Sequence, residues 1–411
     1  MTTALGGVRA DAHVIGWVST AHALSHFFQL TLPPLFPYIK TEFNTSYTVL
    51  GAMLSVFYGV SGLMQTIAGF AVDRFGPRRV LLAGLTAMSV GTALAALASA
   101  PWMLFVAAIV AGMGNSAFHP ADLALLNARV SEPRLSYAFS LHNVGGNIGW
   151  ICAPPFVVTL TALAGWRVAL AAAAVIGVLF VLAFALQRGL RLDADVVKRH
   201  TASRSVPTAA PFEVGILWSR PVLMAFTFFA LQAIAMVGFM TFSTTAFVAL
   251  YDVPLVFATS LLTAFLVGGI AGTLVGGALA ANTGRHVAIA VSCLALGALL
   301  AAVIASGAVS TGLLWPLAAG VGIVVGAANP SRDILVRGIA PPHARGRVYG
   351  FVYSGLDAGA GIAPLAFGWL LDHGMPAATF ALGALALLLA IPTVLDLRAA
   401  RTTNSPTAAI K

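Results

Sequence analysis

Polar and ionisable side chains recur at helical spacing inside otherwise apolar stretches of this 411-residue chain. Two sets share spacings of four and three residues: His22, His26 and Gln29, then Asn115, His119 and Asp122. Residues at these intervals lie on one face of a helix. Imidazole, carboxylate and amide groups gathered on such a face can exchange protons and bind polar solutes. Because ionisable groups are costly in an apolar segment, we take both sets as functional candidates.

His119 and Asp122 are less than one helical turn apart, so the carboxylate could accept the imidazole N–H. Pro120 interrupts the helical hydrogen-bond ladder between them. We predict proton transfer at His119 and Asp122, with Asp333 and Asp357 as further candidates.

Other polar residues in apolar stretches extend the predicted substrate cavity: Asn143, Asn147, Gln232, Asn329, Arg332 and Tyr353, beside His142. Each has a structural alternative. Buried amides often serve only as contacts between helices, worth about 1 kcal/mol, and the tyrosine could simply pack. An ion pair from Asp122 to Arg332 or Arg129 would likewise be structural.

These residues must be positioned by membrane-spanning helices. The chain is 59% hydrophobic and 9% charged, with a mean hydropathy of +0.93, whereas soluble domains are about 25% charged. A spanning helix needs about 20 apolar residues. Twelve segments meet that length, near 14–38, 46–72, 80–99, 102–129, 136–164, 166–187, 221–250, 254–281, 286–306, 312–337, 346–372 and 376–397. We therefore predict an all-α integral membrane protein with twelve transmembrane helices.

The basic residues predict the orientation of these helices. Of 22 Lys and Arg residues, all but Lys40, Arg167 and Arg332 sit at the ends or in every second gap between apolar segments. Because basic residues stay on the cytoplasmic side, both termini are expected in the cytoplasm. The chain itself is expected in the cell (inner) membrane. The net charge of +9 is then explained by topology and contact with anionic lipid, not by nucleic-acid binding. Arg332 stands apart, within a polar helix face, and is expected to be a cavity charge.

The chain divides into two similar halves. We expect a six-helix half over 1–187, a cytoplasmic linker over 188–220, a second six-helix half over 221–397 and a cytoplasmic tail over 398–411. A constant spacing of 210 residues joins Gly112 to Gly322, Pro120 to Pro330, Gly145 to Gly355, Gly149 to Gly359 and Pro154 to Pro364. Two pseudo-symmetric halves of this kind are typical of transporters, whose site lies near mid-membrane between the repeats.

A glycine-rich basic motif follows the second segment: Gly69-x-x-x-Asp73-Arg74-x-Gly76-x-Arg78-Arg79. Gly76 permits a tight turn, and Gly69 is expected to allow close helix packing. The motif resembles the loop signature of the major facilitator superfamily. That resemblance implies a gate in which Asp73 pairs with a helix terminus and an arginine, for which Arg129 is the candidate. Otherwise Asp73 only balances local charge. Ala281 replaces the acid in the second copy.

Two short motifs are similar to the fosmidomycin-resistance-like branch of that superfamily: Phe118-His119-Pro120 and Gly145-Gly146-Asn147-x-Gly149. The ridge of Gly145, Gly149 and Pro154 also resembles the signature of drug/proton antiporters and lets helices approach closely. Gly355, Gly359 and Pro364 repeat this ridge. The early arginine usual in such antiporters is absent, since Ala108 holds its place.

The sequence and its resemblance together favour a secondary active exporter, coupled to protons, for a small polar or drug-like molecule. An importer or uniporter of a small organic anion is the alternative, favoured by Arg332 and Ala108. A non-transporting sensor or scaffold, or an intramembrane enzyme, is remote. No HExxH pair or phosphate-binding loop occurs, and Cys152 and Cys293 both lie within predicted spans. We expect no cofactor or metal, and a monomer.

Overall fold

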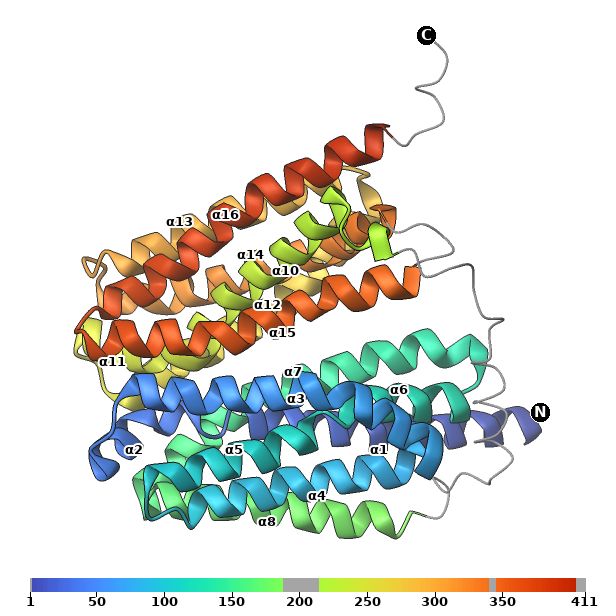
Figure 1. Cartoon of the computed structure of the whole chain (residues 1–411), viewed down its shortest axis with the longest axis horizontal. Coiled ribbons are helices and arrows are strands. Elements are labelled where there is room, and N and C mark those ends of the chain that lie inside the picture. Colours follow the sequence, from blue (N-terminus) through green and yellow to red (C-terminus); the bar gives the residue numbers. More distant parts are fainter. Residues whose placement is uncertain (1, 188–213, 340–344, 404–411) are drawn as a thin grey trace. The chain divides into compact units, whose positions relative to one another are not determined.

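Long apolar runs fold into helices throughout the part of the chain that the computed structural model describes, residues 2–187, 214–339 and 345–403. These residues form no strand (Figure 1). Ten helices among them are long and apolar enough to cross a membrane. Two further helices of 28 residues, α1 (Thr2–Gln29) and α15 (Arg345–Asp372), are more polar and complete the predicted twelve.

The helices of the first half begin and end at prolines, glycines and short turns. They are α1, α2 (Phe36–Phe43), α3 (Tyr47–Phe75), α4 (Pro77–Ala96), α5 (Pro101–Asn115), α6 (Phe118–Arg129), α7 (Leu135–Ala164) and α8 (Trp166–Ala185). The first segment ends at Gln29 and not near 38, because Pro33 and Pro34 begin a 3-10 turn (Pro33–Leu35). The predicted fourth span is divided between α5 and α6.

The second half follows the same plan. Its helices are α10 (Arg220–Val237), α11 (Ser243–Tyr251), α12 (Leu255–Asn282), α13 (His286–Ala305), α14 (Thr311–Ile339), α15 and α16 (Pro376–Thr403). A π-helical turn (Gly238–Phe242) joins α10 to α11, so one span contains both. The last helix runs past the predicted end at 397 to Thr403. Residues 188–213 of the predicted linker lie outside the described residues.

The chain forms two compact units, Met1–Thr45 with Val56–Pro211 and Ser46–Ser55 with Phe212–Lys411. In the first, α1 packs on α7 while α4 packs on α5 and α8. In the second, α10 packs on α15 while α13 packs on α14 and α16. The same pairings, displaced by one half of the chain, give two pseudo-symmetric six-helix halves.

Glycines set the closest helix contacts in both units. A Cβ added to Gly149 on α7 would lie 1.9 Å from the carbonyl oxygen of Ala23 on α1. A Cβ added to Gly359 on α15 would lie 2.4 Å from that of Ala230 on α10. Gly145 and Gly355 make equivalent contacts one turn away. Backbones therefore touch where the predicted small-residue ridges lie, and Pro154 and Pro364 follow within the same helices.

A polar cluster joins the last turn of α2 to the start of α8. Both carboxylate oxygens of Glu42 are used: Oε2 accepts a hydrogen bond of 2.6 Å from the indole of Trp166, and Oε1 pairs with the guanidinium of Arg167. Partial burial would raise the pKa of Glu42, but these hydrogen bonds and the charge of Arg167 outweigh it, so its pKa lies below the ordinary value. Arg167 therefore has a local structural partner.

Candidate functional site

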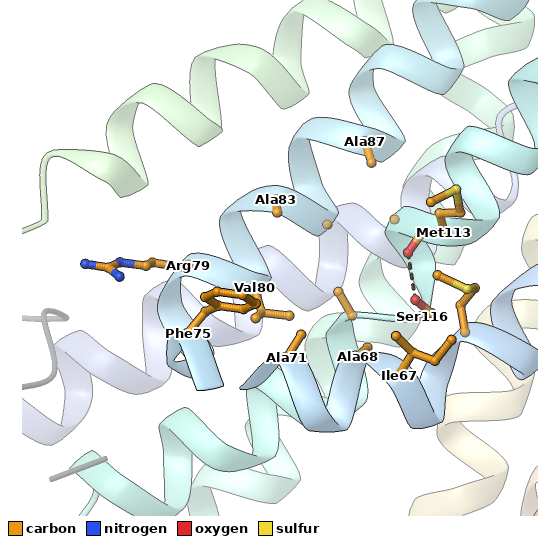
Figure 2. Close-up of a pocket in the computed structure, with 14 residues that line it drawn as sticks. Ile67, Ala68, Ala71, Phe75, Arg79, Val80, Ala83, Ala87, Met113 and Ser116 are labelled. Atoms are coloured by element: carbon orange, nitrogen blue, oxygen red, sulfur yellow. Dashed lines mark hydrogen bonds between the residues drawn. The ribbon is translucent and has the colours of Figure 1, made fainter. Parts of the chain in front are cut away.

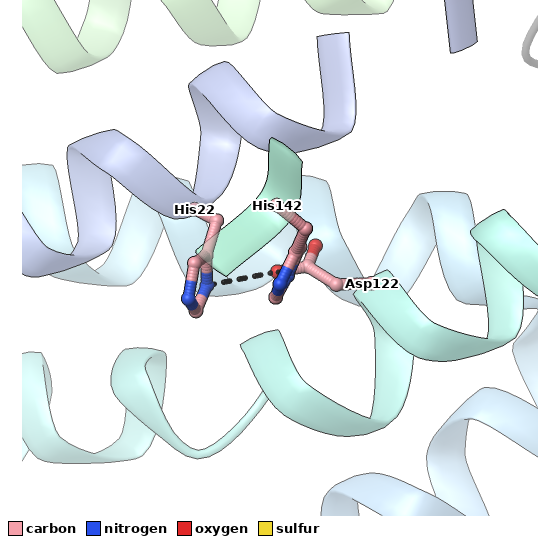
Figure 3. A group of neighbouring side chains, drawn as sticks. All are labelled: His22, Asp122 and His142. Carbon is pink, nitrogen blue, oxygen red and sulfur yellow. Dashed lines mark hydrogen bonds and ion pairs between the residues drawn. The ribbon is translucent and has the colours of Figure 1, made fainter. Parts of the chain in front are cut away.

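A fully buried carboxylate forms the centre of the polar site in the first unit (Figure 3). Asp122 lies on α6 and accepts contacts from two other helices through the same oxygen, Oδ2. His142 Nε2 on α7 is 3.0 Å away and within hydrogen-bond geometry. His22 Nδ1 on α1 is 3.2 Å away. Three helices thus bring together an acid and two imidazoles with almost no exposure.

Several polar atoms in this cluster lack hydrogen bonds. Asp122 Oδ1 has no partner among the described residues, and the Nδ1 atoms of His22 and His26 are likewise without one in hydrogen-bond geometry. A buried polar atom without a partner costs about 1–3 kcal/mol. The cluster therefore has unused hydrogen-bonding capacity at these atoms.

The imidazole rings stack upon one another. The His22 ring lies 3.8 Å from that of His142 with 21° between their planes and 4.4 Å from that of His26. His26 in turn stacks on Trp150, with ring centroids 4.1 Å apart. Trp150 received no role from the sequence, although it follows Asn147 by three residues on α7 and so shares its helix face.

The same three groups offer the donor types of a transition-metal site, and one ligand atom from each lies within 4.8 Å of the others. The lone pair of an imidazole nitrogen lies in the plane of its ring. Both imidazole nitrogens, His22 Nδ1 and His142 Nε2, approach the same carboxylate oxygen, Asp122 Oδ2, at 3.2 and 3.0 Å, so the carboxylate occupies the point on which they converge. The geometry therefore favours hydrogen bonding over metal ligation.

A second polar network joins four helices of the same unit. Gln29 on α1 donates to Asn115 Oδ1 on α5 at 2.8 Å and accepts from Trp150 Nε1 at 3.1 Å. Asn115 donates to Ser61 Oγ on α3 at 2.8 Å. Two predicted cavity residues thus hydrogen-bond each other, with Ser61 as a partner that the sequence did not reveal.

The predicted partnership of His119 with Asp122 does not occur. His119 is exposed within its unit, its ring is 5.5 Å from that of His22, and it forms no hydrogen bond with Asp122 among the described residues. Asp122 instead points into the core, toward α1 and α7. Asn143 is exposed, and Asn147 donates only to its backbone oxygen at 3.1 Å, within α7.

A cation lies at the centre of the polar cluster in the second unit. Arg332 on α14 donates from Nε to Asp333 Oδ1 at 2.9 Å and from NH1 to Gln232 Oε1 at 2.9 Å and Asn329 Oδ1 at 3.1 Å. Tyr353 on α15 donates to Asp333 at 3.3 Å. Five predicted site residues from three helices therefore meet, whereas Asp357 is exposed and forms no hydrogen bond among the described residues.

The residues of the glycine-rich basic motif have separate positions. Gly76, between α3 and α4, has a φ of 86°, a conformation that favours glycine. Arg78 donates to the carbonyl oxygens of Phe184 (3.4 Å) and Ala185 (2.6 Å) and so caps the end of α8. The prediction that Gly69 allows close helix packing is wrong, because an added Cβ would meet no described atom within 4 Å.

The other members of this motif lie around the same helix ends. Asp73 and Arg74 belong to the last turns of α3, and the Arg74 guanidinium carbon is 5.4 Å from the centre of the Phe75 ring. Arg129 ends α6, and its Nε has no hydrogen-bond partner among the described residues. Arg79 is exposed in the first turn of α4.

An apolar pocket of about 520 Å³ lies between α3, α4 and the α5–α6 junction (Figure 2). Alanine and glycine face it from α4, including Ala83, Gly84 and Ala87, and Phe75 and Arg79 lie at one end. Its lining includes Arg79 but none of the predicted proton-coupling or substrate-cavity residues. The small side chains at helical spacing on α4 were the sequence signal for this space, and they were not recognised.

The family of the chain follows from its sequence once this architecture is known. Residues 18–331 and 251–410 match the sequence model of the Major Facilitator Superfamily. The chain belongs to the Major Facilitator Superfamily. Membership makes it a multi-pass membrane protein, and the resemblance noted in the sequence is confirmed.

Members of the superfamily with curated names match parts of the chain. It is 28% identical over 141 residues to the fosmidomycin resistance protein of Escherichia coli (strain K12), covering 34% of each chain. It is 27% identical over 280 residues to the uncharacterized MFS-type transporter YfnC of Bacillus subtilis (strain 168), covering 66% of each. The matched region thus spans about a third of the first relative and about two thirds of the second.

A solved structure matches the fold of nearly the whole chain. The crystal structure of a bacterial homolog of the human lysosomal transporter Spinster, inward-facing and occupied, aligns with a TM-score of 0.69 at 14% identity. The alignment covers 95% of this chain and 96% of that one. The likeness extends to the fold of both six-helix halves.

Proposed function

We propose that the chain is a proton-coupled exporter that exchanges protons for a small polar or drug-like molecule by rocker-switch motion of its two halves. The observation that carries this proposal is Asp122, a fully buried intramembrane carboxylate with two imidazoles at one oxygen and no partner at the other. Ionisable groups within spans mark proton and substrate pathways in transporters.

The coupling follows from the cost of a buried charge. A proton bound to the Asp122 carboxyl neutralises it, and a proton bound to a neighbouring imidazole balances its charge. Loss of that proton leaves an uncompensated carboxylate anion away from water. Moving the surrounding helices is cheaper with the balanced form, because an uncompensated buried charge costs several kcal/mol. His142 and His22 are placed to accept or donate that proton at Oδ2, at 3.0 and 3.2 Å.

The solute is proposed to contact the polar residues that surround these clusters. In the first half they are His22, His26, Gln29, Asn115, His119, Asn143 and Asn147; in the second they are Gln232, Asn329, Arg332 and Tyr353. Asp333 and Asp357 stay secondary candidates for proton coupling. The name of the fosmidomycin resistance protein supports export of a drug-like solute.

The remaining features of the proposal concern the membrane and the gate. Both termini are proposed to lie in the cytoplasm, with the chain in the inner membrane, and the distribution of Lys and Arg supports this orientation. The basic residues beside helix ends suit contact with anionic lipid, and the chain is proposed to act as a monomer. Asp73, Arg74, Arg79 and Arg129 are proposed to form the gate, with Arg78 holding the end of α8.

Transport into vesicles tests the proposal. Purified chain is reconstituted into liposomes that are acidic inside, and uptake of labelled fosmidomycin is measured as protons leave. We expect accumulation above the external concentration, and a rate lowered about tenfold or more in Asp122→Asn, because general acid–base groups contribute at least that factor.

Asp252→Asn is the matched control, since Asp252 is an exposed acid in the turn after α11 and its αL conformation suits asparagine. It should transport at the wild-type rate. Accumulation that ignored the pH gradient, or that survived in Asp122→Asn, would refute proton coupling through this cluster.

A further inference from the structure

The repeat places Asp122 and Arg332 at equivalent positions. Pro120 and Pro330 are 210 residues apart, and each precedes its charged residue by two. The packing keeps this register. A Cβ added to Gly112 would meet the carbonyl oxygen of Phe57 at 2.6 Å, and one added to Gly322 would meet that of Phe265 at 2.0 Å. The two halves therefore present an acid and a base from corresponding turns.

The facing helices keep a register of their own. Gly149 contacts the backbone of Ala23 on α1, and Gly359 contacts that of Ala230 on α10. His22 and Phe229 each come one residue earlier, so they are equivalent. Asp122 approaches the imidazole of His22 to 3.2 Å, and the Arg332 guanidinium carbon lies 4.6 Å from the centre of the Phe229 ring. Each charge thus faces the aromatic ring suited to it, as an anion beside an imidazole and a cation over a phenyl face.

Hydrogen bonds fix the orientation of the Arg332 guanidinium but do not use all of its N–H groups. Its Nε and NH1 donate to three acceptors on neighbouring residues. Its NH2 group donates to no described residue. The Arg332 side chain is 13% exposed, so the side chain as a whole is not fully sealed from solvent. A fixed guanidinium with an unused N–H edge is preorganised for an acceptor from outside the chain.

A neighbouring amide adds a second unused donor. Asn329 Oδ1 accepts from both Gln232 Nε2 at 2.7 Å and Arg332 NH1 at 3.1 Å. Because two donors share this oxygen, the orientation of the Asn329 amide is settled and its Nδ2 points elsewhere. That Nδ2 has no hydrogen-bond acceptor among the described residues. The site therefore offers N–H groups from two side chains.

Asp333 does not make this site a closed ion pair. It contacts Arg332 only through Nε, and its side chain is 47% exposed while the arginine is largely buried. An exposed carboxylate can hold the Nε side while the opposite edge of the guanidinium stays available. Retaining an arginine within a span is costly, and a ligand with the opposite charge would offset that cost.

We propose that Arg332 binds an anionic oxoacid group, such as a carboxylate, phosphonate or sulfonate, of the transported molecule. The Nδ2 of Asn329 assists, and Gln232 and Phe229 hold the guanidinium in position. The biological role of this anion site rests on the proposed transport function, but the binding experiment that tests the site does not depend on it. Each half of the chain then binds one ligand: the first half binds the proton at Asp122, and the second half binds the anion at Arg332.

Binding of simple probes to the purified full chain in detergent tests the assignment. Thermal unfolding is followed with butyrate, butylphosphonate or butanesulfonate, and with uncharged butyramide, all at equal ionic strength. Binding to the folded state raises the unfolding temperature. We expect at least one anion to raise it while butyramide does not. Arg332→Gln should weaken the apparent affinity about tenfold or more, since charge-assisted hydrogen bonds are lost.

Arg332→Lys keeps the charge but not the planar fork, so it should fold and retain a reduced anion effect. Arg285→Gln, at an exposed basic residue before α13, should behave as wild type. No stabilisation of the wild type by any of the three anions, or full stabilisation of Arg332→Gln, would overturn the proposal. Since neither a membrane nor a pH gradient is present, failure of proton coupling would leave these results unchanged.

Discussion

At the scale of single residues, the orientation of Asp122 decides which groups can share its proton. The carboxylate lies on the buried side of α6, where Oδ2 meets His142 Nε2 at 3.0 Å. His119, only three residues away on the same helix, stays exposed. The imidazole that matters for proton transfer is therefore expected to come from another helix.

Alanine substitutions separate the two histidines. His142→Ala removes the hydrogen-bond partner of the buried acid, so we expect the proton-driven rate of solute uptake to fall about tenfold or more. His119→Ala removes a ring without a hydrogen bond to Asp122, so the maximal proton-driven rate should stay within about threefold, because the Asp122 cluster is unchanged. As a proposed solute contact, His119 is expected to act instead on the solute concentration that gives half-maximal uptake. Uptake by both variants is compared in vesicles at equal protein content. A larger loss in His119→Ala than in His142→Ala would contradict this assignment.

The sequence identified most polar members of the two clusters but not their partners. Helical spacing shows which residues share a face, so Gln29, Arg332 and Asn329 were found. Pairing across helices depends on how far one helix is displaced along another, which no periodicity reveals; hence Asp122 was paired with His119. Phe229 carried no signal because an aromatic residue in a span is normally core.

At the scale of helices, the contact between α1 and α7 determines the position of the histidine stack. Gly145 and Gly149 let the backbones of these helices touch, at Ser19 and Ala23. His22 lies between these two contacts on α1, and its ring can therefore stack on His142 at 3.8 Å. The small-residue ridge thus sets the distance between the imidazoles.

Adding a methyl group at Gly149 tests the contact between α1 and α7. Gly149→Ala would place Cβ 1.9 Å from the Ala23 carbonyl oxygen, so α1 and α7 must separate. Overpacking of this kind costs about 1–3 kcal/mol, and a lower unfolding temperature is expected in a thermal unfolding assay. Gly16→Ala on α1 is the control, because its Cβ would meet nothing within 4 Å. It should be neutral or slightly stabilising, since alanine favours the helix. Equal effects of the two substitutions would contradict the packing argument.

Helix boundaries were predictable where proline or glycine marks them and less so elsewhere. Apolar length predicted the start of α4 to within three residues of Pro77, and Gly165 separates α7 from α8 as expected. The end of α1 was missed because apolar residues continue past Pro33 and Pro34, so hydropathy outweighed the backbone chemistry of proline. The extension of α16 to Thr403 exceeds the apolar segment, since a helix can continue into polar surroundings.

At the scale of the whole molecule, the fold was predictable from three global properties: hydropathy, the alternation of basic residues and the 210-residue repeat. Each averages over many residues and tolerates local errors. The two units then arise from the same helix pairings repeated in order. The solute, by contrast, depends on a few side chains and was not specified by any global property.

The orientation of the chain can be tested with reporters. Because nearly all basic residues lie in alternate gaps, both termini are expected in the cytoplasm. Green fluorescent protein fused after Lys411 should fluoresce, and alkaline phosphatase fused there should be inactive; the same pair at Met1 should behave alike. A fusion in the gap near Asn44, between α2 and α3, should give the opposite pattern and serves as the control. Active phosphatase at either terminus would reverse the proposed topology.

The opposite signs of Asp122 and Arg332 also constrain how the two halves can have diverged. Two exact copies of the first half would carry two acids at these positions and no base, and two copies of the second would carry two bases and no acid. A symmetric ancestor could not have offered separate sites for a cation and an anion. The proposed exchange of protons for an anionic solute therefore requires two repeats that are no longer interchangeable.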